Sequence, residues 1–259
     1  MGDELGDEVQ ARMTKQTYSP IVELRQYTLH PSKRETLIEL FDREFVETQE
    51  AVGMQVIGQF RNLDDPDQFV WLRGFNTMSA REQSLHAFYS GPIWKAHRDA
   101  ANSTMIDSDN VLLLHPARQT SGFSLNGNRP PTNSAVEQNG FVAATIYSFN
   151  KPVDPDFINY FENTIHPVLM EKEFHLLAYF VTEDSPNTFP ALPVREGEHV
   201  FVWFAGFQDQ DAYERHTAEL NQTTLWSQDI SKYLKRRLIK APEVLRLTPT
   251  PRSRLTGRP

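Results

Sequence analysis

The sequence FVWLRGF at residues 69–75 is nearly repeated as FVWFAGF at residues 201–207. The match extends well beyond these stretches, because Trp94 corresponds to Trp226 in the same register, and a single insertion after Pro186 lengthens the second copy. Repetition on this scale, with tryptophans and glycines kept in step, indicates two copies of one structural unit.

Each copy predicts the same order of elements. In the first copy, β-branched and aromatic residues over 21–29 predict a strand, and Ser32–Glu35 matches a capping box that starts a helix. The other elements of the first copy are expected at residues 54–61, 68–75, 78–105 and 111–115. The second copy repeats the order at residues 141–149, 155–170, 174–182, 199–207, 209–238 and 244–247.

Strand–helix–strand–strand–helix–strand is the split βαβ, or ferredoxin-like, order. Its antiparallel sheet carries helices on one face only, so the other face needs cover. We therefore expect an α+β fold in which two tandem ferredoxin-like units pack their open faces together as a barrel-like pseudodimer. The expected divisions are a disordered tail at 1–19, a first unit at 20–117, a linker at 118–139, a second unit at 140–250 and a disordered tail at 251–259.

The composition narrows the possible partners and compartments. The chain has 259 residues and a formal net charge of −8, which disfavours nucleic acid as a partner. It contains no cysteine, so disulfides, thiolate nucleophiles and Cys-based metal sites are excluded. No stretch approaches the roughly 18 apolar residues of a membrane span, and residues 1–19 lack the features of a secretory signal. We therefore expect a cytoplasmic protein with no membrane partner and no metal.

Three stretches of the first copy resemble one known family. They are VELRQYTLHPSKRETLIELFDREF (residues 22–45), FVWLRGF (residues 69–75) and AFYSGPIWKAHRDAANSTMIDSDNVLLL (residues 87–114). Together they are similar to the NIPSNAP family, a branch of the dimeric α+β barrel superfamily, and the second copy resembles a diverged unit of the same type. The resemblance implies a tandem pseudodimer that forms homo-oligomers. Related branches include cofactor-independent monooxygenases, haem enzymes and isomerases, so the site itself must indicate the reaction.

Alternation along the strands predicts where a site lies, because successive side chains of a strand point to opposite faces. If the helices cover Val22 and Leu24, then Glu23, Arg25 and Tyr27 face the space between the two sheets. An enclosed face would then carry a carboxylate, guanidiniums, a phenol and an indole. By the same argument this face also includes Gln59, Trp71 and Arg73.

The second copy keeps the aromatic members of this set and loses the charged ones. Tyr147 and Trp203 correspond to Tyr27 and Trp71. The replacements are Ala143 for Glu23, Thr145 for Arg25, Ala205 for Arg73, His175 for Gln55 and Tyr179 for Gln59. We therefore expect a pocket with one charged and one aromatic wall, suited to a small hydrophobic or aromatic molecule with a polar or anionic end.

The segment around His97 is a second candidate. On a helix, Trp94, His97 and Ala101 share one face, with Arg98 beside them. In one interpretation His97 is a general base or an axial haem ligand at the rim of the pocket. In the other, Trp94 anchors the helix to the sheet and His97 is its hydrogen-bonded neighbour.

The leading hypothesis is a small-molecule enzyme of the cofactor-independent monooxygenase, isomerase or lyase type. Its candidate catalytic residues are Glu23, Arg25, Tyr27 and His97. Its candidate ligand-binding residues are Gln59, Trp71, Arg73, Arg98, Tyr147, His175, Tyr179 and Trp203. One alternative is a haem enzyme of the same superfamily, with His97 or His175 as axial ligand. Another is a non-catalytic interaction protein in which Glu23, Arg25 and Arg73 form a structural salt-bridge cluster.

Overall fold

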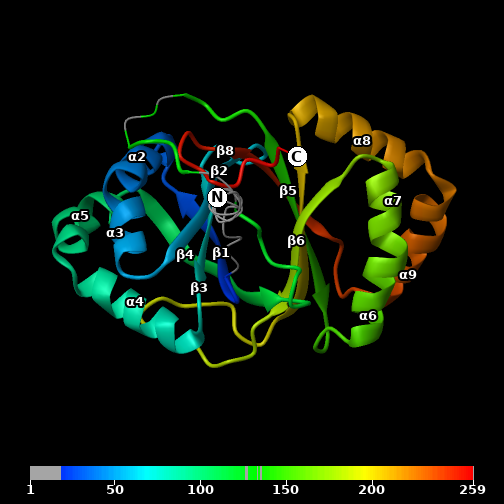
Figure 1. The fold of residues 1–259 in the computed structure, drawn as a ribbon, viewed down its shortest axis with the longest axis horizontal. Coiled ribbons are helices and arrows are strands. Elements are labelled where there is room, and N and C mark those ends of the chain that lie inside the picture. The colour runs from blue at the N-terminus through cyan, green and yellow to red at the C-terminus, as the bar shows by residue number, and fades with distance from the viewer. Residues whose placement is uncertain (1–18, 126–127, 133, 135, 259) are drawn as a thin grey trace, which may run out of the picture.

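The computed structural model describes residues 19–125, 128–132, 134 and 136–258. The tail expected at residues 1–19 lies, apart from Ser19, outside the described residues. In the part of the chain that is described, eight strands close into one barrel, and helices flank it on two opposite sides (Figure 1). None of the described helices is long and apolar enough to cross a membrane.

The first unit has the expected order of elements. Its strands are β1 (Ile21–Leu29), β2 (Gln55–Asn62), β3 (Gln68–Phe75) and β4 (Met105–Pro116). Its helical segments are α2 (Arg34–Leu40), the π-helical turn η1 (Phe41–Phe45), α3 (Val46–Ala51), α4 (Met78–Ser90) and α5 (Pro92–Asn102). The break between α4 and α5 falls at Gly91, and Pro92 is the first residue of the new helix, where its missing N–H costs nothing.

The second unit repeats this order. Its strands are β5 (Phe141–Phe149), β6 (His175–Thr182), β7 (His199–Phe207) and β8 (Glu243–Pro249). Its helical segments are α6 (Pro155–Tyr160), η2 (Phe161–Ile165), α7 (His166–Glu171), α8 (Gln210–Gln222), η3 (Leu225–Ile230) and α9 (Ser231–Arg237). Segments η1 and η2 occupy corresponding places in the two copies, whereas η3 replaces what is regular helix in α5.

The strand order around the barrel is β1-β3-β2-β8-β5-β7-β6-β4. Each unit therefore contributes one four-stranded ferredoxin-like sheet. The two sheets join where β2 pairs with β8, for example at Phe60 and Pro249, and where β4 pairs with β6, for example at Leu114 and Thr182. The predicted tandem pseudodimer of ferredoxin-like units is confirmed.

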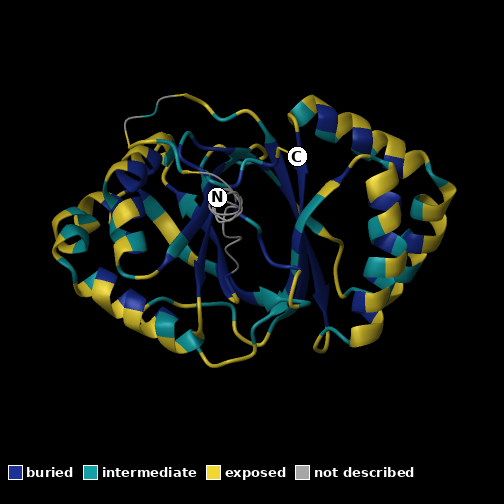
Figure 2. Cartoon of the chain, in the orientation of Figure 1, coloured by how far each residue is buried: buried dark blue, intermediate teal, exposed yellow. Residues whose placement is uncertain are grey.

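The interior of the barrel is filled by apolar side chains from both units. Val22 and Leu72 of the first sheet meet Val142 and Phe204 of the second in one core cluster. The other face of each sheet packs against the helices of its own unit. Both faces of the sheets are consequently buried, while the helices are exposed only on their outer sides (Figure 2).

The predicted direction of the site residues is therefore wrong. Glu23, Arg25, Tyr27, Trp71 and Arg73 lie between the first sheet and its own helices rather than between the two sheets. The physical reason is that both faces are covered, and the barrel interior is bounded by strands that offer no free polar groups. A guanidinium needs buried partners, and only the helices supply them.

The two tryptophans of the repeated strand likewise do not face each other across the barrel. Trp71 packs with the first unit's helices and Trp203 with those of the second. Since the units are related as two halves of a barrel, the equivalent outward faces of the two sheets point away from each other.

The predicted capping box does not form. Ser32 has a φ of 64°, and its backbone N–H donates to Asp67 Oδ1 at 2.8 Å. Helix α2 begins after Lys33 without a side-chain cap. Glu35 instead accepts hydrogen bonds from Arg61 at 2.9 and 2.7 Å.

Two segments expected to lack structure are packed against the barrel. Phe123 and Leu125 of the linker insert into the barrel core, as does Leu255 of the C-terminal segment. Arg252 is also buried, and its guanidinium donates to the Asp42 carbonyl and to Glu47. Residues 251–258 are thus ordered by buried contacts, contrary to the expectation of a disordered tail.

Candidate functional site

A cluster of four buried charged residues lies between the first sheet and α4. Glu23 Oε2 accepts hydrogen bonds from Arg25 Nη1 and Arg73 Nε, both at 2.7 Å, and Glu23 Oε1 accepts one from Arg81 Nε at 2.6 Å. All four side chains are fully buried. We call Glu23, Arg25, Arg73 and Arg81 the guanidinium cluster.

The electrostatics of this cluster fix Glu23 in its charged form. Burial alone would raise the pKa of Glu23, but attraction to Arg73, Arg25 and Arg81 outweighs it and holds the pKa well below its usual range. A carboxylate held ionised in this way is a poor general base. Its geometry supports the alternative in which these residues are a structural salt-bridge cluster.

Aromatic side chains complete the surroundings of the cluster. Arg25 Nε donates to the Tyr27 hydroxyl at 2.9 Å, and the guanidiniums of Arg25 and Arg73 lie 5.6 and 5.1 Å from the Trp71 ring centroid. The adjoining space between sheet and helices, lined by Tyr27 and Trp71 among others, has a volume of only about 40 Å³. It is too small for an aromatic ligand.

Sequence reasoning missed Arg81. It lies on α4 with its side chain turned toward the sheet, and Leu85 and Phe88 share its buried face. The sequence does contain a signal for it, because Arg81 begins a helical row of buried positions with four- and three-residue spacing. An arginine in such a row is expected to be buried and therefore to have an acidic partner.

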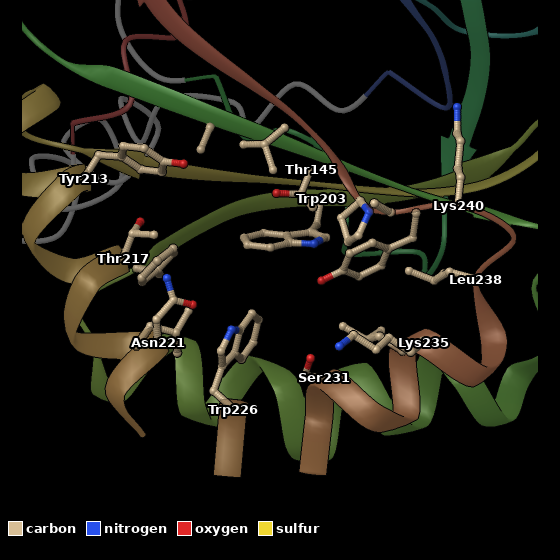
Figure 3. Close-up of a pocket in the computed structure, with 18 of the residues that line it drawn as sticks. Thr145, Trp203, Tyr213, Thr217, Asn221, Trp226, Ser231, Lys235, Leu238 and Lys240 are labelled. Atoms are coloured by element: carbon tan, nitrogen blue, oxygen red, sulfur yellow. The ribbon is translucent and has the colours of Figure 1, made fainter. Parts of the chain in front are cut away.

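The equivalent place in the second unit is open. Ala143, Thr145, Ala205 and Tyr213 stand where the first unit has Glu23, Arg25, Arg73 and Arg81. A cavity of about 440 Å³ lies there, bounded by the sheet on one side and by α8, η3 and α9 on the other (Figure 3). We call it the second-unit cavity. Tyr147 and Trp203, two predicted ligand-binding residues, line it.

The walls of the second-unit cavity are largely aromatic. Trp203 lies on the sheet side of the cavity, and Trp226 of η3 points toward it from the helix side (Figure 3). Tyr147, Phe174 and Tyr213 complete the aromatic lining. The cavity has the flat, apolar surfaces that bind aromatic rings.

A few polar groups converge on this lining. Trp203 Nε1 and Thr217 Oγ1 are buried and make no hydrogen bond of ordinary geometry to a described residue, but each lies beside a tyrosine hydroxyl. Trp203 interacts with Tyr147 and Thr217 with Tyr213, which partly offsets the rise in the pKa of each tyrosine. Burial raises the pKa of Tyr147, so its hydroxyl stays protonated and can donate. The Lys235 side chain points into the cavity beside Ser231, whereas that of Lys240 points away (Figure 3).

The remaining predicted residues lie away from this cavity. His97 Nε2 is 3.5 Å from Glu44 Oε2 on the first unit's helices, and Arg98 is exposed beside Asp99. His175 is exposed at the start of β6. Gln59 donates to Asp42 Oδ1 at 2.9 Å, and Tyr179 donates to Glu162 Oε1 at 2.7 Å. The structure therefore brings the predicted residues together at two separate places. Tyr147 and Trp203 line the second-unit cavity, whereas the guanidinium cluster gathers Glu23, Arg25, Tyr27, Trp71 and Arg73.

The closed eight-stranded barrel built from two ferredoxin-like halves places the chain in the class of dimeric α+β barrel proteins, with both halves in one polypeptide. Residues 22–119 match the family model of the NIPSNAP proteins. The match covers the first unit and leaves the second unit outside it. No curated protein sequence matches the chain.

Solved structures share the whole two-unit architecture. A "putative monooxygenase" from Fusobacterium nucleatum subsp. nucleatum is 12% identical, with a TM-score of 0.54, over 93% of this chain and 97% of its own. A second protein of that name, from Lactobacillus acidophilus, is 15% identical, with a TM-score of 0.52, over 89% and 94%. An anthrone oxidase-like protein is 12% identical, with a TM-score of 0.50, over 92% and 96%. At these identities the likeness establishes the fold.

Proposed function

We propose that the second-unit cavity binds a small, flat aromatic molecule with an anionic or strongly polar end. The observation that carries this proposal is the contrast between the two copies. The same location is filled by the guanidinium cluster in the first unit and open over about 440 Å³ in the second. Packed interiors contain few voids larger than a water molecule, so a space of this size with exposed rim residues fits a binding site.

The lining indicates the chemistry of the ligand. Trp203 and Trp226 offer ring faces for stacking, and Lys235 forms no ion pair with any residue that the structure describes. The Tyr147 hydroxyl, which lies beside the Trp203 indole N–H, can donate to a carbonyl or phenolate oxygen. An aromatic ketone, phenol or carboxylate satisfies all of these groups.

We propose further that the protein is an enzyme of the cofactor-independent monooxygenase type. In such a reaction an activated methylene of an aromatic ketone loses two hydrogens and gains one oxygen atom of O₂, while the second oxygen leaves as water. The substrate supplies all four electrons. Tyr147 and Trp203 would stabilise the enolate oxygen of the substrate, and Lys235 its charge. The names of the proteins with the same architecture support this direction.

Haem does not fit the residues that were suggested to hold it. Neither His97 nor His175 lines the second-unit cavity, and no histidine occurs among its described lining residues.

Binding is tested by titrating the protein with 1-hydroxy-2-naphthoate and following tryptophan fluorescence. Lys235→Gln should weaken binding about tenfold, the loss of one charge-assisted hydrogen bond. Lys232→Gln, on the exposed side of the same helix, is the matched control and should bind like wild type. Ala143→Phe should fill the cavity and abolish binding. Unchanged binding by Ala143→Phe would place the ligand elsewhere.

Activity is tested separately with anthrone in an oxygen electrode. The expected result is uptake of one O₂ per anthrone consumed by the wild type, lost in Ala143→Phe and kept in Lys232→Gln. Binding of anthrone without any O₂ uptake would contradict the proposed oxidation and leave a binding protein.

A further inference from the structure

The guanidinium cluster of the first unit carries more positive than negative charge. Arg25, Arg73 and Arg81 are three cations, and Glu23 is the one carboxylate that they contact among the described residues. Their other hydrogen-bond partners are neutral: the Tyr27 hydroxyl, Gln49, Asn187, Thr188 and the Ser108 carbonyl. The cluster therefore has a formal charge of +2 and no exposure to solvent.

Buried net charge of this kind is strongly unfavourable. Removing an ion from water costs several kcal/mol unless a counter-charge lies beside it. Tyr27 does not provide that counter-charge, because burial raises its pKa and keeps the phenol neutral. The two excess cations need an anion that none of the described residues supplies.

Three donors next to the cluster also lack acceptors. Arg73 Nη2, Arg81 Nη2 and Trp71 Nε1 are buried and make no hydrogen bond to a described residue. Trp71 lines the space of about 40 Å³ described above, together with Tyr27 and Gln49, which bond to Arg25 and Arg73 respectively. A space of that volume exceeds the roughly 30 Å³ share of one water molecule but leaves no room for a ring.

We propose that the first unit holds one small monovalent anion, of the size of chloride, bromide or formate, at the guanidinium cluster. The anion would accept from the Trp71 indole N–H, which belongs to the lining of this space, while the guanidiniums of Arg25 and Arg73 lie 5.6 and 5.1 Å from the Trp71 ring centroid. It would reduce the buried charge from +2 to +1. This site is separate from the second-unit cavity and does not depend on the function proposed for it.

An insertion from the second unit closes this site. Residues 187–198, between β6 and β7, extend toward the end of α4 (Figure 1). Arg81 Nη1 donates to Asn187 Oδ1 at 3.0 Å and to Thr188 Oγ1 at 3.2 Å, and Phe189 is stacked on Tyr89 with ring centroids 5.8 Å apart. The insertion present only in the second copy therefore packs against the α4 side of the cluster of the first.

The test compares thermal unfolding of the full chain in sodium chloride, sodium formate and sodium gluconate at one ionic strength. Gluconate is too large for the space. Chloride and formate should raise the Tm of the wild type by roughly 5 °C or more relative to gluconate at saturation. Arg73→Gln, which lowers the cluster charge by one, should lose most of this difference. Arg98→Gln, exposed on α5, should keep it.

Equal Tm values in chloride and gluconate for the wild type would overturn the proposal, as would an undiminished chloride effect in Arg73→Gln. If that variant does not fold, wild-type crystals grown in bromide give the answer by anomalous scattering. An anomalous peak in the space lined by Tyr27, Gln49 and Trp71 supports the site. Bromide bound only elsewhere overturns it.

Discussion

Replacing Glu23 by glutamine should destabilise the protein more than any single surface change. Glu23 accepts three charge-assisted hydrogen bonds, at 2.7, 2.7 and 2.6 Å, from three fully buried guanidiniums. Glutamine keeps the shape but removes the charge and turns an N–H₂ group toward cationic donors. Removing one partner of a buried ion pair costs about 3–5 kcal/mol, and here three cations lose their shared partner. We expect the free energy of unfolding of Glu23→Gln to fall by an amount in the upper part of that range.

The assay is urea unfolding followed by tryptophan fluorescence, in gluconate buffer so that no small anion compensates the cluster. Glu35→Gln is the matched control, since Glu35 also accepts two hydrogen bonds from an arginine, at 2.9 and 2.7 Å, but has a 54% exposed side chain. Its loss should stay within about 1 kcal/mol. A Glu23→Gln variant within 1 kcal/mol of wild type would refute the view that this carboxylate holds the helix layer to the sheet.

Three other changes test separate parts of the structure. Burial raises the pKa of Asp42 from 3.8 to about 6, so its stabilising contribution is full below pH 3.8 and is lost as the pH rises through 6. The free energy of unfolding of Asp42→Asn should therefore match that of the wild type at pH 4 and exceed it by roughly 2–3 kcal/mol at pH 8. Equal differences between variant and wild type in urea unfolding at both pH values would contradict this. Ala205→Arg puts a guanidinium in the second-unit cavity without a carboxylate partner. Adding Ala143→Glu in a double-mutant cycle should recover roughly 1–3 kcal/mol of the free energy of unfolding. If the losses of the two single variants simply add, the two side chains do not interact. A Cβ on Gly206 would lie 2.1 Å from the Gly257 carbonyl oxygen. Gly206→Ala should therefore displace residues 251–258 and make limited proteolysis of this segment faster. An unchanged cleavage rate would mean that the segment does not pack against Gly206.

The fold could be predicted because its signals are local and occur twice. FVWLRGF forms β3 and FVWFAGF forms β7, each pairing with the first strand of its own unit, as in Glu23 with Arg73 and Ala143 with Ala205. Two ferredoxin-like sheets with open faces have few ways to cover them, and closure through β2–β8 and β4–β6 uses all their edges. Repetition and edge pairing therefore determined the barrel.

The site could be predicted only in part, because alternation divides a strand into two sets without saying which set faces which layer. Leu24 and Glu23 were correctly placed on opposite faces, but both faces are buried, so burial does not distinguish them. The deciding interactions come from elements distant in sequence, such as Arg81 on α4 and Asn187 in the insertion. The sequence shows that the second copy lacks the charged residues of the first. That their replacement by small residues leaves a cavity follows only from the positions of the helices that pack on the sheet.

The two copies differ in how they fill the space inside a shared framework. Both keep the aromatic framework, with Tyr27, Trp71 and Trp94 matched by Tyr147, Trp203 and Trp226. In the first unit the space inside this framework is closed by long charged side chains that bond to one another. In the second unit small residues replace them, and the π-helical segment η3 carries Trp226 where the first unit has regular helix.

π-Helical insertions of this kind are frequent at functional sites because they turn side chains out of helical register. Substitution of a charged cluster by Ala143, Thr145 and Ala205 would leave a destabilising void in a purely structural domain. An open space of about 440 Å³ beside the half-buried Tyr213 and Trp226 agrees with the proposal that a ligand binds there.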